Sequence, residues 1–314
     1  MNNQIFNRYL LRLKLGQIAK KPQNYCDLQN WTSDILFESF CCRFADWQKT
    51  ITKKMAPNTA KDNVINILEI GGKNSYLLNK IASFYNNNNI EKKEIKYWQS
   101  CVDIGFVENK INQSENYFTK QAEENCKINY LIADDQLSPF ANNKFDIIFS
   151  NLNFHLLNLP ELFIFQIKKM LKKGGMFFLG YIGEGNLQDL HLAVSQFQFA
   201  NYQGNFAIIP PTISCQAVAS LLQKTNFVNI TSHNENLQLY YQNLKKLLQD
   251  IKNNAQGNFL HNKNPNFISK KSLELIIENY KINKKIDNDK PNDSDIAVNL
   301  QINFATASNT ISTL

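Results

Sequence analysis

The sequence is poor in the residues that cross-link a chain or bind a metal. Its six cysteines form no C-x-x-C pair, and its four histidines join none of them in a cluster with zinc spacing. We therefore expect no metal site and no dithiol redox motif, and scattered free thiols are typical of a reducing compartment. No run of about 18 apolar residues occurs, so the sequence predicts no membrane span.

A long block of basic residues is also missing. Lys and Arg number 34 against 27 Asp and Glu, a formal net charge of +7, but the excess is scattered as Lys pairs along the chain. Scattered Lys pairs are typical of a solvated surface. A nucleic-acid groove requires basic residues interleaved with aromatic ones on one face. We therefore expect no nucleic-acid partner.

The residues that are present suffice for a sizeable core. Hydrophobic residues make up 43% of the 314 positions. Two aromatic-rich segments at helical spacing fill the first 58 residues, and short β-branched runs then alternate with amphipathic segments. Strands are expected at 64–70, 95–104, 128–133, 145–150, 176–182, 228–233 and 296–305. Helices are expected at 75–84, about 104–120, 159–171, 215–224, 240–252 and 269–280, with Lys172 to Gly175 ending the third of them.

Strands that alternate with helices predict parallel βαβ units. The expected fold class is α/β, a doubly wound, mostly parallel, seven-stranded Rossmann-like sheet with N-terminal helices and a helical insert before the last strand. The expected divisions are an N-terminal helical extension (1–58), a core (59–239), a helical insert and linker (240–295), a last strand that completes the core (296–305) and a tail (306–314).

Polar residues stand where the expected parallel strands end, the edge at which open α/β sheets bind ligands. The candidate binding residues are Glu69, Gly71, Gly72, Asp103, Ile104, Asp134, Asp135, Ser150 and Asn151, and His155 follows them. Such groups suit a nucleoside: glycine admits the ligand to the backbone, and carboxylates accept hydrogen bonds from ribose hydroxyls and from an adenine amino group. Several of these residues also have a purely structural interpretation. Gly71 and Gly72 could form a tight turn, Asp103 could cap a helix N-terminus, and Asp134 and Asp135 could be turn residues.

Four segments resemble class I S-adenosylmethionine-dependent methyltransferases: A-D-D-Q-L-S-P-F at 133–140, K-F-D-I-I-F-S at 144–150, the histidine at 155 and L-K-K-G-G at 171–175. The chain is similar to the subgroup shared by the malonyl-carrier-protein methyltransferase of biotin synthesis and the methyltransferase-type assembly factor of mitochondrial complex I. The latter match also includes residues 5–8, 150–155, 185–190 and 296–305, so the resemblance covers nearly the whole chain.

The sequence departs from this family mainly at the glycine loop. The family reads D-x-G-x-G-x-G, whereas residues 69–75 read E-I-G-G-K-N-S, so Lys73 and Ser75 replace two glycines. A Cβ at those positions can clash where the backbone should approach the cofactor. Further departures are Leu156 for a tryptophan, Lys173 for a proline and His191 for an arginine.

The resemblance implies S-adenosylmethionine as cofactor and methyl transfer to a protein or a carrier-bound carboxylate. Asp103 then binds the ribose, Asp134 the adenine and Glu69 the methionine ammonium, and His155 is the nearest base for a neutral acceptor. The alternative is a non-methylating assembly factor for respiratory complex I. The implied partners are a complex I subunit or a carrier protein. Because the match begins almost at Met1, we expect a bacterial cytoplasmic protein, with the mitochondrial matrix as the alternative.

Overall fold

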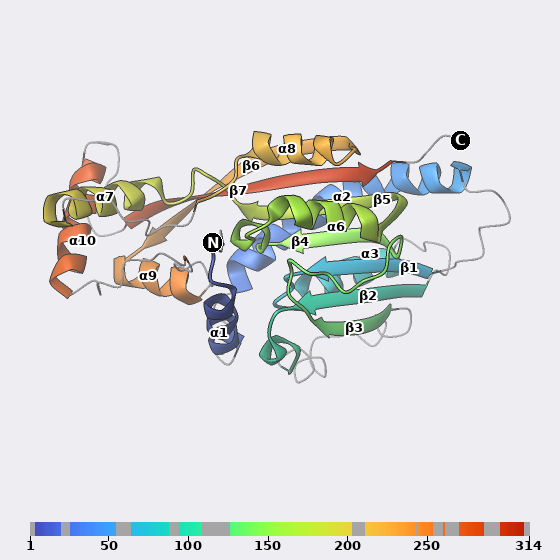
Figure 1. Cartoon of the computed structure of the whole chain (residues 1–314), viewed down its shortest axis with the longest axis horizontal. Helices are drawn as coiled ribbons and strands as arrows, with labels where there is room; N and C mark the ends of the chain where they lie inside the picture. The colour runs from blue at the N-terminus through green and yellow to red at the C-terminus, as the bar shows by residue number, and fades with distance from the viewer. Residues whose placement is uncertain are drawn as a thin grey trace.

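The computed structural model describes residues 4–19, 26–54, 64–87, 94–108, 126–202, 211–242, 244–253, 260, 270–285 and 296–310. A seven-stranded sheet in the order β3-β2-β1-β4-β5-β7-β6 forms its centre (Figure 1). β7 is antiparallel to both of its neighbours, and the other pairs are parallel. The predicted α/β class with a doubly wound, mostly parallel sheet is confirmed.

The strands are β1 (Val64–Ile70), β2 (Glu94–Cys101), β3 (Cys126–Ile132), β4 (Phe145–Asn151), β5 (Leu171–Ile182), β6 (Phe227–Tyr241) and β7 (Ile296–Asn309). The helices are α1 (Arg8–Ala19), α2 (Cys26–Lys54), α3 (Tyr76–Asn87), η1 (Phe154–Leu156), α6 (Pro160–Met170), α7 (Gln188–Tyr202), α8 (Cys215–Lys224), α9 (Leu244–Asn253) and α10 (Lys270–Lys285). A short helical stretch at 104–108 follows β2.

Two apolar layers cover the sheet because alternate strand residues point to opposite faces. On one face, α2 and α3 pack over Ile67, Phe149 and Phe178, with Phe40 of α2 at the centre. On the other face, α6 and α8 pack over the strand residues that point the opposite way, such as Ile148 of β4 and Phe177 of β5. This three-layer arrangement holds the carboxyl ends of β1, β2 and β4 in register, since Ile70 pairs with both Ser100 and Ser150.

A long antiparallel ribbon extends the sheet beyond those ends. Ile182, the last residue of β5, pairs with Ile302, but β7 reaches back to Ile296, which pairs with Tyr241 of β6. A third apolar cluster joins this ribbon to α7, α9 and α10, and Figure 1 shows these helices gathered at its far end. The molecule therefore carries a helical lobe on the side where the parallel strands end.

The structure corrects several predicted boundaries. β2 ends at Cys101 rather than at 104, so Asp103 and Ile104 follow the strand. Residue 171, expected to be the last of a helix, and residues 172–175, expected to end that helix, already belong to β5. β6 continues to Tyr241, so the helix expected from 240 begins at Leu244, and β7 reaches Asn309.

Other predictions are met or remain open. α7 was not predicted at all, whereas β1 and α8 have the predicted limits. Of the helix expected over 104–120, residues 109–120 lie outside the described residues, as do residues 286–295 of the expected insert and linker. No helix in the described ranges is long and apolar enough to cross a membrane. The division of the chain into five segments stays a prediction.

Candidate functional site

The turn after β1 brings two backbones into close contact. Gly71 has a φ of +77° and donates its backbone N–H to Ser100 O at 3.1 Å. A Cβ on Gly71 would lie 2.9 Å from Asn153 Cβ and 3.2 Å from Asn151 O. Because L-residues rarely adopt this φ and the space is already filled, glycine is required at position 71. At Gly72 a Cβ would collide with the side chain of Gln99.

Glu69, the predicted partner of the methionine ammonium, is fully buried beneath this turn. Its Oε2 accepts hydrogen bonds from Tyr97 Oη at 2.8 Å and from Gln99 Nε2 at 2.6 Å. Burial and the adjacent carboxylate raise the pKa of Tyr97 well above its usual value, so this hydroxyl remains a donor. Gln99 also donates to Asn74 O at 2.7 Å, so Glu69 supports the glycine turn from below.

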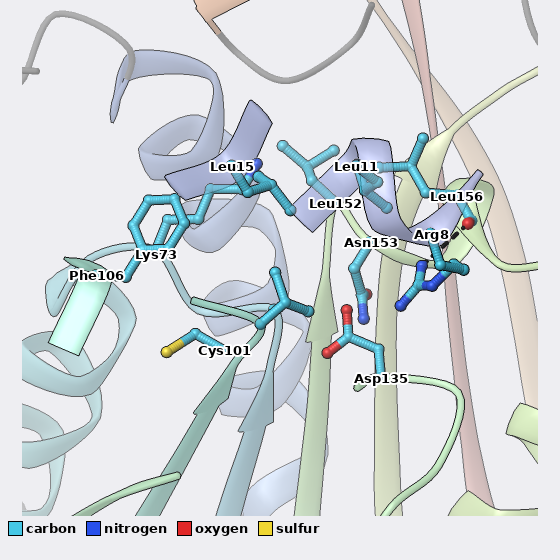
Figure 2. Close-up of a pocket in the computed structure, with 12 residues that line it drawn as sticks. Arg8, Leu11, Leu15, Lys73, Cys101, Phe106, Asp135, Leu152, Asn153 and Leu156 are labelled. Atoms are coloured by element: carbon cyan, nitrogen blue, oxygen red, sulfur yellow. Dashed lines mark hydrogen bonds between the residues drawn. The ribbon is translucent and has the colours of Figure 1, made fainter. Parts of the chain in front are cut away.

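A small cavity lies at these strand ends and is drawn in Figure 2. It joins Gly71 and Lys73 to Cys101, Asp135 and Asn153. Its volume is about 30 Å³, enough for one or two water molecules, whereas sites for small molecules typically measure about 300–1,000 Å³. Leucine side chains of α1 take up the remaining space, as Figure 2 shows for Leu11 and Leu15.

Asp135 is the carboxyl group that points into this cavity (Figure 2). Only 9% of the residue is exposed, and no hydrogen bond to Oδ1 is found from the described residues. Burial raises the pKa of Asp135 to about 6, although the nearby Arg8 cation and the Asn153 amide oppose the rise. A carboxyl group that changes charge near neutral pH thus lines the cavity.

Replacing Asp135 with asparagine is expected to stabilise the fold at pH 7. The pKa of the carboxyl rises from 3.8 to about 6 on folding, so this group favours the native state fully below about pH 4 and loses that contribution as pH rises through 6. A shift of this size corresponds to on the order of 3 kcal/mol. Urea unfolding at pH 4 and pH 7 should show the D135N advantage only at the higher pH.

The matched control for that prediction is Asp46→Asn, since the Asp46 side chain is 84% exposed. It should leave the pH dependence of unfolding as in the wild type. An equal difference between wild type and D135N at both pH values would contradict a titrating Asp135.

The carboxylates of Asp103 and Asp134, predicted to bind the ribose and the adenine, lie beside the cavity and are not part of its lining. Asp103 Oδ1 accepts from Gly105 N at 2.9 Å, an N-terminal cap of the short 104–108 helix. Asp134 Oδ1 accepts from Gln136 N at 2.9 Å and from Arg8 Nη2 at 2.6 Å. Ile104 is 55% exposed. Asp103 and Asp134 adjoin the cavity residues Val102 and Asp135 in sequence, so they lie at its edge.

The polar end of β4 ties the cavity to α2. Ser150 Oγ donates to Asn153 Oδ1 at 2.5 Å, which orients the Asn153 side chain at the cavity wall. Asn151 accepts from Thr32 Oγ1 at 2.8 Å and donates to Ser33 Oγ at 2.9 Å. Ser150 and Asn151 therefore hold the site together without lining the cavity.

His155 lies in η1 on the β5 side of the strand ends. It is buried, and its Nδ1 accepts a hydrogen bond from Ile182 N at 3.4 Å. It does not line the cavity, so its role as a base stays a prediction.

Sequence reasoning overlooked the supporting residues Tyr97 and Gln99. Both lie on the same face of β2 as the buried Ile95, and a glutamine on that otherwise apolar face was the available signal.

Comparison with known proteins shows the kind of domain and the fold. A methyltransferase-domain family profile matches residues 93–179, from β2 to β5, which includes Asp103, Asp134 and His155 but not the glycine turn. The folds of a Bacillus halodurans methyltransferase and of the YcgJ protein from Bacillus subtilis superpose with TM-scores of 0.51 each. The Bacillus halodurans protein is 12% identical in sequence, and the superposition covers 85% of this chain and 100% of that one. YcgJ is 14% identical, and the superposition covers 81% of this chain and 96% of that one.

Three sequence relatives indicate which methyltransferase-like proteins this chain is similar to. A Rickettsia prowazekii protein described as a methyltransferase is 29% identical over 150 residues, 48% of this chain and 66% of that protein. The human mitochondrial arginine-hydroxylase NDUFAF5 is 24% identical over 150 residues, 48% of this chain and 44% of that protein. A malonyl-[acyl-carrier protein] O-methyltransferase of Gallionella capsiferriformans is 23% identical over 180 residues, 57% of this chain and 60% of that protein.

The chain spans less than two thirds of the length of each of these relatives, so the activity of the whole protein is a proposal. The strand order, the methyltransferase-domain match and these relatives agree with one another. Residues 93–179 therefore match a methyltransferase domain, and the chain is similar to class I S-adenosylmethionine-dependent methyltransferases of the subgroup that includes the malonyl-carrier O-methyltransferases and the NDUFAF5 proteins.

Proposed function

We propose that the chain binds S-adenosylmethionine at the ends of β1, β2 and β3 and transfers its methyl group to a protein or carrier-bound carboxylate. The observation that carries the proposal is the cavity that joins Gly71 to the buried carboxyl of Asp135. A backbone cradle that a Cβ would fill and a buried carboxyl oxygen that accepts no bond in the described residues both suit a polar nucleoside.

The types of residue at the site suit such a cofactor. Gly71 would admit it to the backbone, with Gly72 continuing the turn, and Asp103 and Asp134 would accept hydrogen bonds from its hydroxyl and amino groups. Glu69 would act through the glycine turn, because Tyr97 and Gln99 already bond to its carboxylate. When bound, the cofactor supplies a sulfonium methyl group, and the site's part is to position the acceptor and exclude water. A carboxylate acceptor needs no base, whereas a neutral one would rely on His155.

The helical lobe suits a large acceptor. α7, α9 and α10 sit on the β6–β7 ribbon beyond the carboxyl ends of the parallel strands, so an acceptor presented there would face the proposed cofactor site. A carrier protein or a respiratory complex I subunit is the proposed partner, in the cytoplasm of a bacterium or in the mitochondrial matrix. Because no basic block interleaved with aromatics occurs, nucleic acid is not proposed.

Isothermal titration calorimetry with S-adenosylmethionine tests the proposal. Wild-type protein should bind it, and Lys73→Gly should bind about tenfold more tightly because the lysine side chain leaves the cavity lining. Lys73→Arg keeps a long cationic side chain there and serves as the control, with no gain in affinity. Absence of binding by wild type and K73G at millimolar cofactor would exclude the proposed function.

A non-methylating role is the second candidate, and two observations favour it. Lys73 occupies the cavity wall where the family has glycine, and the NDUFAF5 relatives carry the name arginine-hydroxylase. Intact mass spectrometry of a candidate acceptor after incubation separates the two roles. With S-adenosylmethionine present, a gain of one methylene per site supports methyl transfer, whereas no change supports the alternative.

A further inference from the structure

Helix α1 lies across the strand ends and closes the cavity. Its Leu11 and Leu15 are buried against Cys101, Val102 and Phe106 and point toward the cavity in Figure 2. The residue Phe6, which precedes α1, is also held in place by hydrogen bonds to distant parts of the chain. Phe6 N donates to Asn158 Oδ1 at 2.6 Å, Asn158 Nδ2 donates back to Phe6 O at 3.0 Å, and Phe6 also bridges to Leu260.

The same helix engages both carboxylates proposed to bind the nucleoside. Arg8 Nη2 contacts Asp134 Oδ1 at 2.6 Å, and its Nη1 donates to Leu156 O at 3.2 Å. The Arg8 and Asp134 side chains are only 11% and 27% exposed, so solvent screens this ion pair less than a surface pair. One turn from the other end of the helix, Gly16 packs on Asp103 so closely that a Cβ would lie 2.6 Å from Asp103 Oδ2.

We propose that α1 is a lid over the nucleoside site, latched by the Arg8–Asp134 ion pair, which must move for the cofactor to enter. A cavity of about 30 Å³ cannot hold a nucleoside while Leu11 and Leu15 fill the rest of the space. Entry of the ligand displaces Arg8 from Asp134 and Gly16 from Asp103, which frees both carboxylates. The inference rests on the proposed function, because it assigns these carboxylates to that ligand.

A lid of this kind lowers the observed affinity for the ligand. When only a fraction of molecules is open, the apparent dissociation constant is the intrinsic one divided by that fraction. A change that weakens the latch and leaves both carboxylates in the chain therefore tightens binding. The chain offers two such changes, at positions 8 and 16, which act by different physical means.

The first change is Arg8→Met, which removes the cation and keeps most of the side-chain length. The second is Gly16→Ala, whose methyl group would press on Asp103 Oδ2 while favouring the helix itself. Arg12→Met is the matched control, because Arg12 is exposed on the same helix and lines no part of the cavity. Hydrogen exchange of α1 amides in the ligand-free full-length protein and calorimetry with S-adenosylhomocysteine are the two measurements.

We expect R8M and G16A to exchange α1 amides faster and to bind S-adenosylhomocysteine about tenfold more tightly, with R12M like the wild type. Unchanged α1 exchange in both variants would overturn the lid, as would faster exchange accompanied by wild-type affinity. Faster exchange in variants that bind no nucleoside at millimolar concentration would support the latch and reject the proposed function, so the two failures can be told apart.

Discussion

Replacing Phe40 with alanine is expected to lower the free energy of unfolding by about 3–5 kcal/mol. Phe40 is fully buried on α2, and its ring lies 5.5 Å from Phe84 of α3, 6.0 Å from Phe149 of β4 and 6.1 Å from Phe178 of β5. Truncation removes the contacts that fasten α2 to the sheet and leaves a cavity that its neighbours cannot all fill. Equilibrium unfolding in urea measures the loss.

Phe199→Ala is the matched control, because that ring is 79% exposed on α7. It should change stability by less than about 0.5 kcal/mol. Phe40→Leu keeps most of the buried volume and should cost less than about 1.5 kcal/mol. A loss below 1 kcal/mol for F40A would show that the aromatic cluster is not what holds α2 on the sheet.

The sequence predicted the elements whose local signal is strong. β1 is a β-branched run that ends at Ile70, directly before Gly71, and its limits were correct because both features are local. α8 was also placed correctly, since Ser214 caps it by accepting from Ala217 N and its buried residues Val218 and Leu222 follow the helical period.

Elements with a blurred pattern were missed or cut short. In α7, Leu192 and Phe199 are exposed while Ala193 and Phe197 are buried, so the apolar residues do not mark one face. β6 forms the edge of the sheet and is mostly exposed, and the polar run N-E-N at 234–236 follows the predicted end of the strand. Gly174 and Gly175 resemble a helix end, yet they lie inside β5, where Trp47 Nε1 donates to Gly174 O at 3.0 Å.

The strand pattern predicted where the carboxylates of the site lie, but it could not predict which residues they contact. Because parallel strands end at one edge of a sheet, the positions of Glu69, Asp103 and Asp134 were predictable to within a residue or two. Their partners were not, since Arg8 and Asp134 are 126 residues apart and no local rule pairs them. Closure of the site by α1 is thus a tertiary feature that required the structure.

Replacing Gly71 with alanine is expected to destabilise the fold and to impair the proposed ligand site together. At a φ of +77° an alanine costs about 1–2 kcal/mol, and its Cβ would lie 2.9 Å from Asn153 Cβ. Asn153 must then shift, and since it lines the cavity, S-adenosylmethionine binding should weaken by about tenfold or more. Urea unfolding and calorimetry give the two quantities.

Two further variants separate backbone strain from crowding in this prediction. Asparagine tolerates positive φ better than alanine but keeps the Cβ, so Gly71→Asn should recover part of the stability and none of the affinity. Gly180→Ala in β5 is the control, because its Cβ would lie no nearer than 3.3 Å to the Phe304 ring, away from the cavity. If G71A bound the cofactor as well as G180A does, the close approach of the ligand to the β1 turn would be wrong, and the site would have to be sought on the Asp135 side of the cavity.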